Sequence, residues 1–561
     1  MRIGLLTDGG YPYATGESRL WCDRLVRGLA QHEFDIYALS RTAQQEDHGW
    51  IRLPPQVQCV RTAPLWAPED DGRTYGRRER RRFVCHFKEL AAALCGENGD
   101  FAAGLYGLAE LARERGGLYA ALRSELAVRV LESACRAPGT RRAVHAATVL
   151  DYLAFVDRLE RALRPLSLDW YRDDGLGAVD LCHAASGGSA ALTGLLAKRF
   201  FGVPLLVTEY GVQLRAHYLA ADDRELTAPV RALLAAFQGR LAAEVYAQAA
   251  IITPGNTHAR RWQEKCGADR AKLRTVYPGM ESDRFAAVGE GDDSGDEHTL
   301  VWVGRIEPAK DLIALLHAFA EVRKEEPGAR LRLFGAPVHG PEAATYLAHC
   351  KALAAQLFPD EAADAHAVGD NPVSFEEIGG PEAPELADAY AAGAVVVLSS
   401  VIEGFPISLV EAMFCGRATV STDAGAVVEV IGGTGLVVPP RNPRALADAC
   451  LALLRDPERR ERLGAAARAR ALELFTIEQN LTAFRALYLE LISHSPVRRE
   501  AESIGADGEP LPFAHPAEAY VPGNWTGGGT ASGGRIPRWA NGPGPLRGLI
   551  GAAATRKEAR A

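Results

Sequence analysis

The chain has 561 residues, of which 47% are hydrophobic and 24% are charged. These fractions are typical of soluble globular proteins and exclude a wholly disordered or fibrous chain. The formal net charge is −8, which argues against broad nucleic-acid binding, because that function depends on clustered positive charge. The length predicts about three or four structural units.

The cysteine and hydropathy patterns predict a cytoplasmic protein. The ten cysteines are scattered and form no C-x-x-C pair, which is typical of reduced, buried thiols. The first apolar run, Arg2–Thr7, is too short for a signal peptide, because Gly9 and Gly10 interrupt it. The sequence has no run of about 18 uncharged apolar residues, so we predict no transmembrane helix, while peripheral contact with a membrane complex is left open.

The first half of the chain predicts an α/β sheet. Arg2–Thr7 and Asp35–Leu39 have the composition of strands, and the amphipathic segment Ser18–Ala30 between them has that of a helix. Residues 75–165 are rich in Ala, Leu and Arg, and we predict a helical insertion there. Further strands are predicted at Ala178–Cys182, Val203–Thr208 and Ala250–Thr253. Helices are predicted between them, one ending at Phe201 and two others over 224–248 and Thr257–Cys266.

A second α/β unit follows a polar segment. The acidic, glycine-bearing stretch Glu290–His298 predicts a linker between an N-terminal domain, residues 1–289, and a C-terminal domain, residues 299–475. Open α/β sheets bind ligands at the carboxyl ends of their strands, so we expect one ligand site in a cleft between the domains. Strands of the second domain are predicted at Thr299–Val303, Leu331–Phe334 and Val395–Ser399.

The end of the chain has two contrasting parts. Residues 494–561 are rich in Gly, Pro and Ser, a composition that cannot bury a core, and we predict a disordered tail there. The segment before it, Thr476–Ser493, has apolar residues at helical spacing and predicts an amphipathic helix. These residues are Leu481, Phe484, Leu487, Tyr488 and Leu491.

The stretch Ser399–Met413 carries the strongest signal for a ligand site. A buried strand ends at Ser399, and Pro406 suits the first position of a helix, whose free N–H groups and partial positive charge favour a diphosphate. Glu403 in the loop and Glu411 on the helix can both accept hydrogen bonds from sugar or ribose hydroxyls. The alternative is that both glutamates are solvated surface residues.

The loop after Val303 contains two cations. Arg305 can bind a diphosphate bidentately and Lys310 adds a point charge, so the pair could stabilise a departing nucleoside diphosphate. The alternative is a pair of solvated cations, one of them paired with Asp311.

The order of these motifs resembles the donor-binding half of the retaining glycosyltransferases of family 4. The pattern is G-R-x-x-x-x-K-D followed about 90 residues later by E-G-F-P-x-S-L-V-E-A. Cys415–Gly425 and Gly435–Pro440 resemble the strands that come next in that family. The resemblance implies a GT-B fold, in which two Rossmann-like domains face each other across a cleft, here with a helical insertion in the first domain. The final helix would cross back to the N-terminal domain.

The resemblance also implies roles for individual residues. Arg305 and Lys310 would bind the diphosphate, and Glu411 would bind the ribose. Glu403 would bind the hydroxyls of the donor sugar. Backbone at Ile378 and Gly379 would hold the base, and the donor site would also include Gly16, Gly404, Phe405, Pro406 and Ile407.

The N-terminal half resembles PelF-type exopolysaccharide glycosyltransferases. Gly10–Tyr13, with Gly16 and Trp21, is similar to their opening T-Y-P-Y-x-x-G-G-V-S-x-W. His183–Gly187 is similar to their H-A-T-S-x-G segment, and Thr208–Gly211 to their T-E-H-G segment.

Two residues depart from this pattern. Glu17 replaces the second loop glycine, and Tyr210 replaces the histidine of T-E-H-G. His183 would then be the histidine of the cleft, with a catalytic role. The alternative is a hydrogen-bonded histidine at the edge of the sheet.

These features predict a retaining, metal-independent glycosyltransferase. It would move a sugar from a nucleoside-diphosphate sugar, with UDP-glucose favoured, to a glycan or small-molecule acceptor in exopolysaccharide synthesis. No D-x-D triplet follows a predicted strand, so we expect no metal site and no cofactor beyond the co-substrate. In the family, the acceptor attacks on the same face and the donor phosphate helps to take its proton.

Two alternatives remain at this point. Glu17 and Tyr210 suggest a catalytically weak, nucleotide-sugar-binding subunit of a polysaccharide assembly complex. A sugar-nucleotide epimerase with the same fold would also hold a nucleoside diphosphate, but E-G-F-P-x-S-L-V-E favours transfer.

Overall fold

The computed structural model describes most of the chain up to residue 495. Gly16 and Glu17 lie outside the described residues, as does the predicted tail from residue 496 onward. Among the described residues, no helix combines the length and the apolar composition needed to cross a membrane. The described ranges are 1–14, 19–67, 70–96, 99–219, 226–290, 295–337, 340–359 and 371–495.

The N-terminal half, residues 1–290, contains a parallel sheet with the strand order β3-β2-β1-β4-β5-β6. This order places β1 beside β4 at the point where the chain reverses its direction across the sheet. All four residues of β4 are buried, as expected for a parallel strand covered on both faces. The strands are β1 (Arg2–Asp8), β2 (Glu33–Ser40), β3 (Val57–Pro64), β4 (Leu181–Ala184), β5 (Leu205–Glu209) and β6 (Ile251–Pro254).

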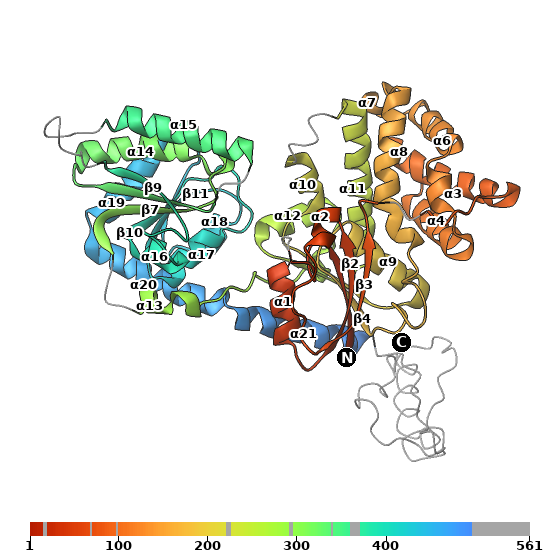
Figure 1. Ribbon diagram of the computed structural model, residues 1–561, viewed down its shortest axis with the longest axis horizontal. Coiled ribbons are helices and arrows are strands. Elements are labelled where there is room, and N and C mark those ends of the chain that lie inside the picture. Colours follow the sequence, from red (N-terminus) through yellow and green to blue (C-terminus); the bar gives the residue numbers. More distant parts are fainter. Residues whose placement is uncertain are drawn as a thin grey trace, which may run out of the picture. The chain divides into compact units, whose positions relative to one another are not determined.

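Helices cover both faces of this sheet (Figure 1). One group connects the strands: α1 (Arg19–Gly28), α2 (Ala43–Asp47), α9 (Ser189–Phe201), α10 (Gln213–Leu219), α11 (Ala228–Gln248) and α12 (Thr257–Lys265). A second group, between β3 and β4, occupies the segment predicted as a helical insertion: α3 (Arg77–Cys95), α4 (Phe101–Arg115), α5 (Leu118–Leu122), α6 (Glu125–Cys135), α7 (Arg142–His145) and α8 (Val149–Leu163).

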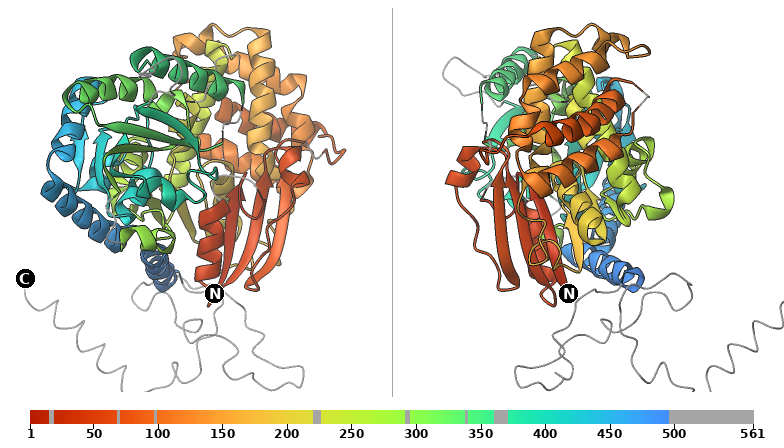
Figure 2. Two further views of the ribbon diagram at one scale, coloured as in Figure 1. Left: turned by 60° about the vertical axis from the view of Figure 1, so that its left-hand side comes forward. Right: turned by 90° about the vertical axis from the view of Figure 1, so that its right-hand side faces the viewer.

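The insertion helices pack on the face of the sheet opposite to α1. Phe83, Phe87 and Leu90 of α3 are buried at helical spacing, in one core with Tyr37 and Leu39 of β2. The alternate residues of β2 face a second core that contains α1. Figure 2 shows the insertion helices gathered together on their side of the strands.

The C-terminal half, residues 295–475, repeats the same topology. Its sheet has the order β12-β11-β10-β7-β8-β9, again with every neighbour parallel. Counted from its own first strand, this is the order of the N-terminal sheet, so β7 lies beside β10 at the reversal point. The strands are β7 (Asp296–Gly304), β8 (Arg330–Gly335), β9 (Val373–Glu377), β10 (Gly393–Leu398), β11 (Ala418–Thr422) and β12 (Leu436–Val438).

The C-terminal sheet is also covered on both faces. Leu300 and Trp302 of β7 belong to one core, and Val301 and Val303 belong to the other, because successive side chains of a strand point to opposite faces. The covering helices within this half are α14 (Leu312–Glu325), α15 (Pro341–Leu357), α16 (Leu386–Ala391), α17 (Ile407–Phe414), α18 (Val427–Ile431), α19 (Pro443–Leu454) and α20 (Pro457–Leu474). The short helix α13 (Ala286–Gly289), which ends the preceding half in the sequence, follows Phe285 of the same C-terminal core.

The last described helix, α21 (Ile477–His494), packs against the N-terminal half. Thr476 caps it by accepting a hydrogen bond from the N–H of Gln479, over 3.3 Å. Its buried face, which includes Phe484 and Tyr488, shares a core with Ile3 and Leu5 of β1. The helix therefore joins the end of the chain to its first strand.

The structure differs from the sequence-based prediction at several strands. β4 begins at Leu181 rather than at Ala178, and β7 begins at Asp296 rather than at Thr299. β3 was not predicted because it is an edge strand with only Ala63 fully buried, so it lacks a clear apolar pattern. β9, at the corresponding edge of the C-terminal sheet, was missed for the same reason.

Phe484 should be important for stability because it is fully buried between α21 and the N-terminal strands. We expect Phe484→Ala to lower the free energy of unfolding by about 3–5 kcal/mol. The matched control is Leu489→Ala on the same helix, where the side chain is 60% exposed. Denaturant unfolding of both variants tests this, and equal small losses would contradict the packing of α21.

Candidate functional site

The loops after β7 and β10 meet at the reversal point of the C-terminal sheet. Arg305 and Lys310 follow β7, and Glu403 follows β10. Because β7 and β10 are neighbours, their carboxyl ends form the crevice where open α/β sheets bind ligands. The structure therefore brings together the two stretches that the sequence singled out.

Lys310 and Glu403 form an ion pair in this crevice. The Lys310 side chain is 16% exposed and the Glu403 side chain is 8% exposed. Glu403 also accepts a hydrogen bond from the Ser400 hydroxyl, over 2.7 Å. Glu403 is thus not the solvated loop residue of the alternative interpretation.

Asp311 is not the partner of either cation. Its carboxylate instead caps α14 by accepting a hydrogen bond from the N–H of Ala314, over 3.2 Å. Arg305 extends into solvent, with 77% of its side chain exposed, and within the described ranges its one ion pair is a loose contact of 3.6 Å to Glu307. Arg305 is therefore free to reach an anion in the crevice.

Hydrogen bonds to backbone carbonyls hold the two loops together. The N–H of Val401 donates to the carbonyl of Ala309 over 2.9 Å, and the Ser399 hydroxyl donates to the carbonyl of Lys310 over 2.7 Å. From the next strand, the Thr422 hydroxyl donates to the carbonyl of Ser400 over 2.6 Å. The position of the ion pair is therefore fixed by three neighbouring strand ends.

The two glycines of this region have different roles. A Cβ atom at Gly404 would meet nothing within 4 Å, so the space beside it is open. Gly425 has a φ of +60°, and a Cβ there would lie 2.4 Å from the carbonyl oxygen of Glu403. Gly425 allows the β11 loop to pack against the Glu403 loop, a structural role that sequence reasoning did not assign.

Helix α17 begins one residue later than predicted. Pro406 is its N-cap residue and Ile407 its first residue, a difference within the usual uncertainty of helix ends. The Phe405 ring packs against Tyr277 and Phe475, with ring centroids 6.3 and 5.7 Å apart. The side chain of Ile407 is exposed. In the first turn, the N–H groups of Ile407 and Leu409 donate to the carbonyls of Phe405 and Pro406 over 3.0 and 3.1 Å, so the positive end of the helix dipole, more than free N–H groups, is what this turn offers an anion.

Glu411 lies on α17 and is largely withdrawn from water. Its Oε2 accepts a hydrogen bond from the Tyr390 hydroxyl over 2.7 Å. Burial raises the pKa of Glu411 to about 6, an effect that the Tyr390 hydrogen bond and the charge of Arg284 partly oppose. A carboxylate in such surroundings is not the solvated helix residue of the alternative interpretation.

Ile378 and Gly379 follow β9, so they lie at the carboxyl ends of the strands of the same sheet. The N–H of Ile378 donates to the carbonyl of Gly335 over 3.0 Å, and the N–H of Gly379 donates to the carbonyl of Ala383 over 2.8 Å. Both N–H groups are therefore engaged, and a nucleotide base at this position would meet carbonyl oxygens.

The catalytic role predicted for His183 does not fit its surroundings. His183 is 0% exposed, and its Nδ1 and Nε2 atoms each lie 2.7 Å from a hydroxyl group, of Tyr488 and Thr208 respectively. Burial lowers the pKa of His183 to about 3, so its imidazole is neutral. Both ring nitrogens are occupied within the protein, which leaves neither to a substrate.

Tyr210 and Glu209 of the T-E-Y-G segment make contacts within the fold. The Tyr210 hydroxyl accepts a hydrogen bond from Asn480 of α21 over 3.2 Å, and its ring lies 5.4 Å from that of Trp21. Glu209 is buried, accepts hydrogen bonds from Tyr246 and Gln263, and has its pKa raised by that burial. These two side chains stabilise the fold around the carboxyl end of β5.

Sequence reasoning missed the residues of the N-terminal half that touch the C-terminal half. Arg215 donates to the carbonyl of Glu403 over 3.2 Å. The carboxylate of Glu429 on α18 accepts hydrogen bonds from Thr257 at the start of α12 and from Tyr277. These pairs are far apart in the chain and belong to no shared motif, so no sequence signal connects them.

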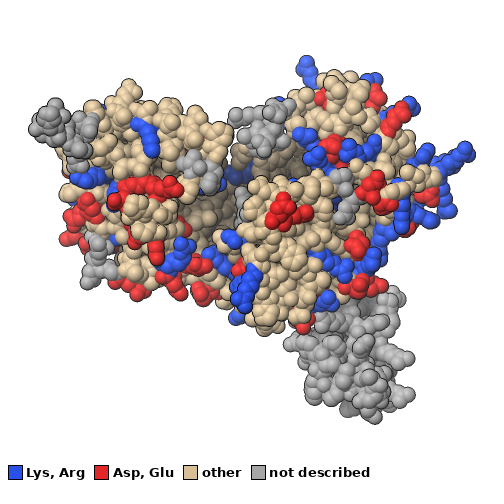
Figure 3. All heavy atoms as spheres, in the orientation of Figure 1, with Lys and Arg blue, Asp and Glu red and all other residues tan. Residues whose placement is uncertain are grey.

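Exposed arginines also gather on α3, outside this crevice. Arg77, Arg78, Arg80 and Arg81 of α3 are exposed, and Figure 3 shows blue side chains gathered over this helix. Within the described ranges, no three His, Cys, Asp or Glu side chains gather as a metal site would require.

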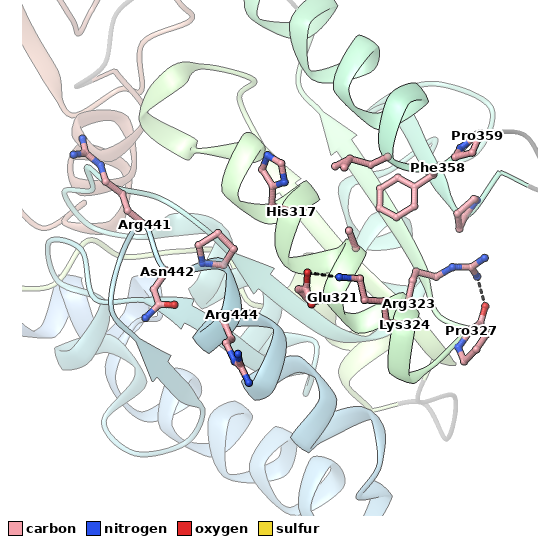
Figure 4. A pocket seen from close by; sticks show the side chains of 14 residues that line it. His317, Glu321, Arg323, Lys324, Pro327, Phe358, Pro359, Arg441, Asn442 and Arg444 are labelled. Carbon is pink, nitrogen blue, oxygen red and sulfur yellow. Dashed lines mark hydrogen bonds and ion pairs between the residues drawn. The ribbon is translucent and has the colours of Figure 1, made fainter.

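A groove of about 890 Å³ lies along α14. Figure 4 shows His317, Glu321 and Lys324 projecting from this helix, with an ion pair of 2.7 Å between Lys324 and Glu321. None of the predicted donor-binding residues lines the groove, so it is separate from the candidate site.

Two family matches divide the chain along the same lines as its sheets. Residues 1–271 match a domain of unknown function (DUF3492). Residues 297–456 match the family of glycosyl transferases group 1. The candidate site between β7 and β10 lies within the second match.

Curated relatives match only part of the chain. The D-inositol 3-phosphate glycosyltransferase of Kineococcus radiotolerans is 34% identical over 247 residues, which cover 40% of this chain and 54% of that protein. The protein of the same name from Kribbella flavida is 32% identical over 287 residues, which cover 49% of this chain and 63% of that protein. The chain thus spans less than two thirds of the length of either relative.

Solved structures define the class of fold. Anabaena HepE in complex with UDP has a TM-score of 0.52 at 14% identity, over 88% of this chain and 100% of that one. Sucrose-phosphate synthase from Thermosynechococcus elongatus has a TM-score of 0.52 at 17% identity, over 88% of this chain and 99% of that one. With its two parallel six-stranded sheets, this chain has the predicted GT-B fold.

The raised pKa of Glu411 predicts a pH-dependent difference in stability. The pKa of Glu411 is about 6 in the folded state and has its ordinary value of 4.5 in the unfolded state. At pH values between these two, the folded state therefore holds more protons at this site than the unfolded state. Its contribution to the free energy of unfolding therefore falls as pH rises. Since Gln cannot ionise, we expect the stability of Glu411→Gln relative to the wild type to increase by about 2 kcal/mol from pH 4.5 to 7.

Denaturant unfolding at several pH values measures this difference. Glu473→Gln, at an exposed position of α20, is the matched control and should follow the wild type at each pH. If the free energies of unfolding of Glu411→Gln and the wild type changed equally with pH, the pKa of Glu411 would not be raised and this prediction would be wrong.

Proposed function

We propose that this chain is a retaining, metal-independent glycosyltransferase. It moves a sugar from a nucleoside-diphosphate sugar, with UDP-glucose favoured, to a glycan or small-molecule acceptor in exopolysaccharide synthesis. The observation that carries the proposal is the meeting of Lys310, Arg305 and Glu403 at the reversal point of the second sheet, beside the N-terminus of α17. Cations and helix N–H groups at such a point suit a diphosphate.

The donor would lie along the edge formed by β7, β9 and β10. Arg305 and Lys310 bind the diphosphate, and Glu411 accepts hydrogen bonds from the ribose hydroxyls. Glu403 binds the donor sugar and at the same time orients Lys310 through their ion pair. The base lies against Ile378 and Gly379. The remaining contacts of the C-terminal half come from Gly404, Phe405, Pro406 and Ile407.

The proposed reaction breaks the bond between the anomeric carbon and the β-phosphate oxygen. The electron pair of that bond leaves with the nucleoside diphosphate, and the positive charges of Arg305 and Lys310 stabilise it there. The acceptor oxygen forms its bond to the anomeric carbon on the same face. Its proton passes to a phosphate oxygen of the leaving group. Configuration is retained because the acceptor attacks the face from which the leaving group departs.

The comparisons guide the choice of probes. HepE shares the fold and was solved with UDP, which makes UDP-sugars the first donors to test. The two curated relatives act on D-inositol 3-phosphate according to their names, which makes this compound a useful small-molecule acceptor beside glycan fragments.

A donor screen tests the proposed function. UDP-, GDP- and ADP-sugars are added to the purified chain, and melting temperature and nucleoside-diphosphate release are measured. A ligand that binds only the folded state raises the melting temperature, and we expect this for UDP-glucose, with release when an acceptor is present. If no nucleotide sugar stabilises the chain, the proposed function is wrong.

One observation favours a second function, that of a nucleotide-sugar-binding subunit with little turnover. The sealed position of His183 and the packing of Tyr210 on α21 leave neither side chain to assist at the sugar. Stabilisation by a nucleotide sugar without transfer to any acceptor would support this function.

Arg305 offers the clearest test of the diphosphate site, because its exposed side chain contributes little to folding. We expect Arg305→Ala to lower the rate of transfer by about 10²–10³-fold while the melting temperature stays unchanged. Arg462→Ala, at an exposed position of α20, is the control. Steady-state kinetics with saturating acceptor would refute the assignment if Arg305→Ala and the control were equally active.

Transfer should also survive removal of divalent cations. The proposed site neutralises the diphosphate with Arg305, Lys310 and the N-terminus of α17, so EDTA should leave the rate within about twofold of the untreated enzyme. A large loss that Mg²⁺ or Mn²⁺ restores would contradict metal-independent transfer.

A further inference from the structure

We infer that Arg215 is a further cation of the donor site, supplied by the N-terminal half, and that it binds the diphosphate of the nucleotide sugar. This inference rests on the proposed function and extends it. No motif in the sequence assigns a role to Arg215, which lies on α10 just after β5.

The position of Arg215 follows from one contact. Its Nη2 atom donates to the carbonyl oxygen of Glu403 over 3.2 Å. Glu403 is the residue whose carboxylate pairs with Lys310, and the next residue, Gly404, borders open space. Arg215 and Lys310 therefore reach the same loop from different halves of the protein.

The charge of Arg215 is not matched by an acid. Among the described residues, no carboxylate oxygen lies within 4.0 Å of its guanidinium, and the contact to a carbonyl compensates only part of a full charge. By comparison, Lys310 has Glu403 as its partner. An anion that enters the crevice would find Arg215 with most of its five N–H donors still available.

The surroundings of Arg215 are also positive. The nearby His258 has a buried Nε2 atom without a hydrogen-bond partner. The pKa of His258 is lowered, first by burial and then by the charges of Arg215, Arg261 and Lys265. Glu429 lies beside the same helix, α12, but its carboxylate accepts hydrogen bonds from Thr257 and Tyr277. This wall of the N-terminal half therefore favours an anionic ligand.

The planar guanidinium group of Arg215 is well suited to a diphosphate. It can keep one N–H on the Glu403 carbonyl and present a planar pair of N–H groups to two phosphate oxygens. When the bond to the sugar breaks, negative charge grows on the β-phosphate, and Arg215 would stabilise it together with Arg305 and Lys310. The diphosphate would thus contact both halves of the protein.

Substitution of Arg215 tests this role. The variants are Arg215→Gln, which removes the charge, and Arg215→Lys, which keeps it without the planar group. Helix α10 has no buried residues, so neither variant should unfold the chain, and melting temperature checks this. The control is Arg231→Gln, at an exposed position of α11.

Calorimetric titration with UDP and with uridine separates phosphate binding from base binding. We expect Arg215→Gln to bind UDP about tenfold more weakly than the wild type and Arg215→Lys to be intermediate. Uridine affinity should stay within about twofold for both variants. The rate of transfer from UDP-glucose should fall for Arg215→Gln and stay unchanged for Arg231→Gln.

Two outcomes would overturn the inference while leaving the proposed function intact. One is an Arg215→Gln variant that binds UDP and transfers sugar as the wild type does. The other is an equal loss of affinity for UDP and uridine, which would mean that Arg215 only supports the Glu403 loop. If the wild type binds neither UDP, GDP nor ADP, the proposed function itself fails, and this inference fails with it.

Discussion

The ion pair between Lys310 and Glu403 is the interaction on which the candidate site depends. Both side chains are mostly buried, and removing one partner would leave an uncompensated charge that costs about 3–5 kcal/mol. The pair therefore fixes the loop after β7 against the loop after β10. Arg305, the open space beside Gly404 and the N-terminus of α17 all lie on or next to these two loops. A donor diphosphate that binds there would meet Lys310 already oriented by Glu403.

The N-terminal half reaches the same region through residues that no motif marks. Arg215 contacts the Glu403 loop, and Thr257 and Tyr277 hold Glu429 of α18. Helix α21 completes the connection by packing against β1. These contacts join the loops of the candidate site to the N-terminal half.

The sequence was sufficient to predict the fold class and the two loops of the site, because both depend on short-range patterns. A buried strand followed by a glycine loop and a helix predicts the crevice at β7 and β10. The burial of His183 was not predicted from the sequence, although the alternation of side chains along a strand indicates the face on which it lies. Cys182 and Ala184 face one core, so His183 points to the other face and meets Tyr488. The pairing of Lys310 with Glu403, and the contact of Arg215, depend on tertiary packing that local patterns do not encode.

A crystal structure of the chain with UDP bound would test the central claim most directly. The account predicts phosphate oxygens within about 3 Å of Arg305 and Lys310 and the ribose hydroxyls at Glu411, because these are hydrogen-bonding distances. The base would lie against Ile378 and Gly379. UDP bound elsewhere, for example in the groove along α14, with Lys310 and Glu403 still sealed from the ligand, would contradict the assignment of this crevice as the donor site.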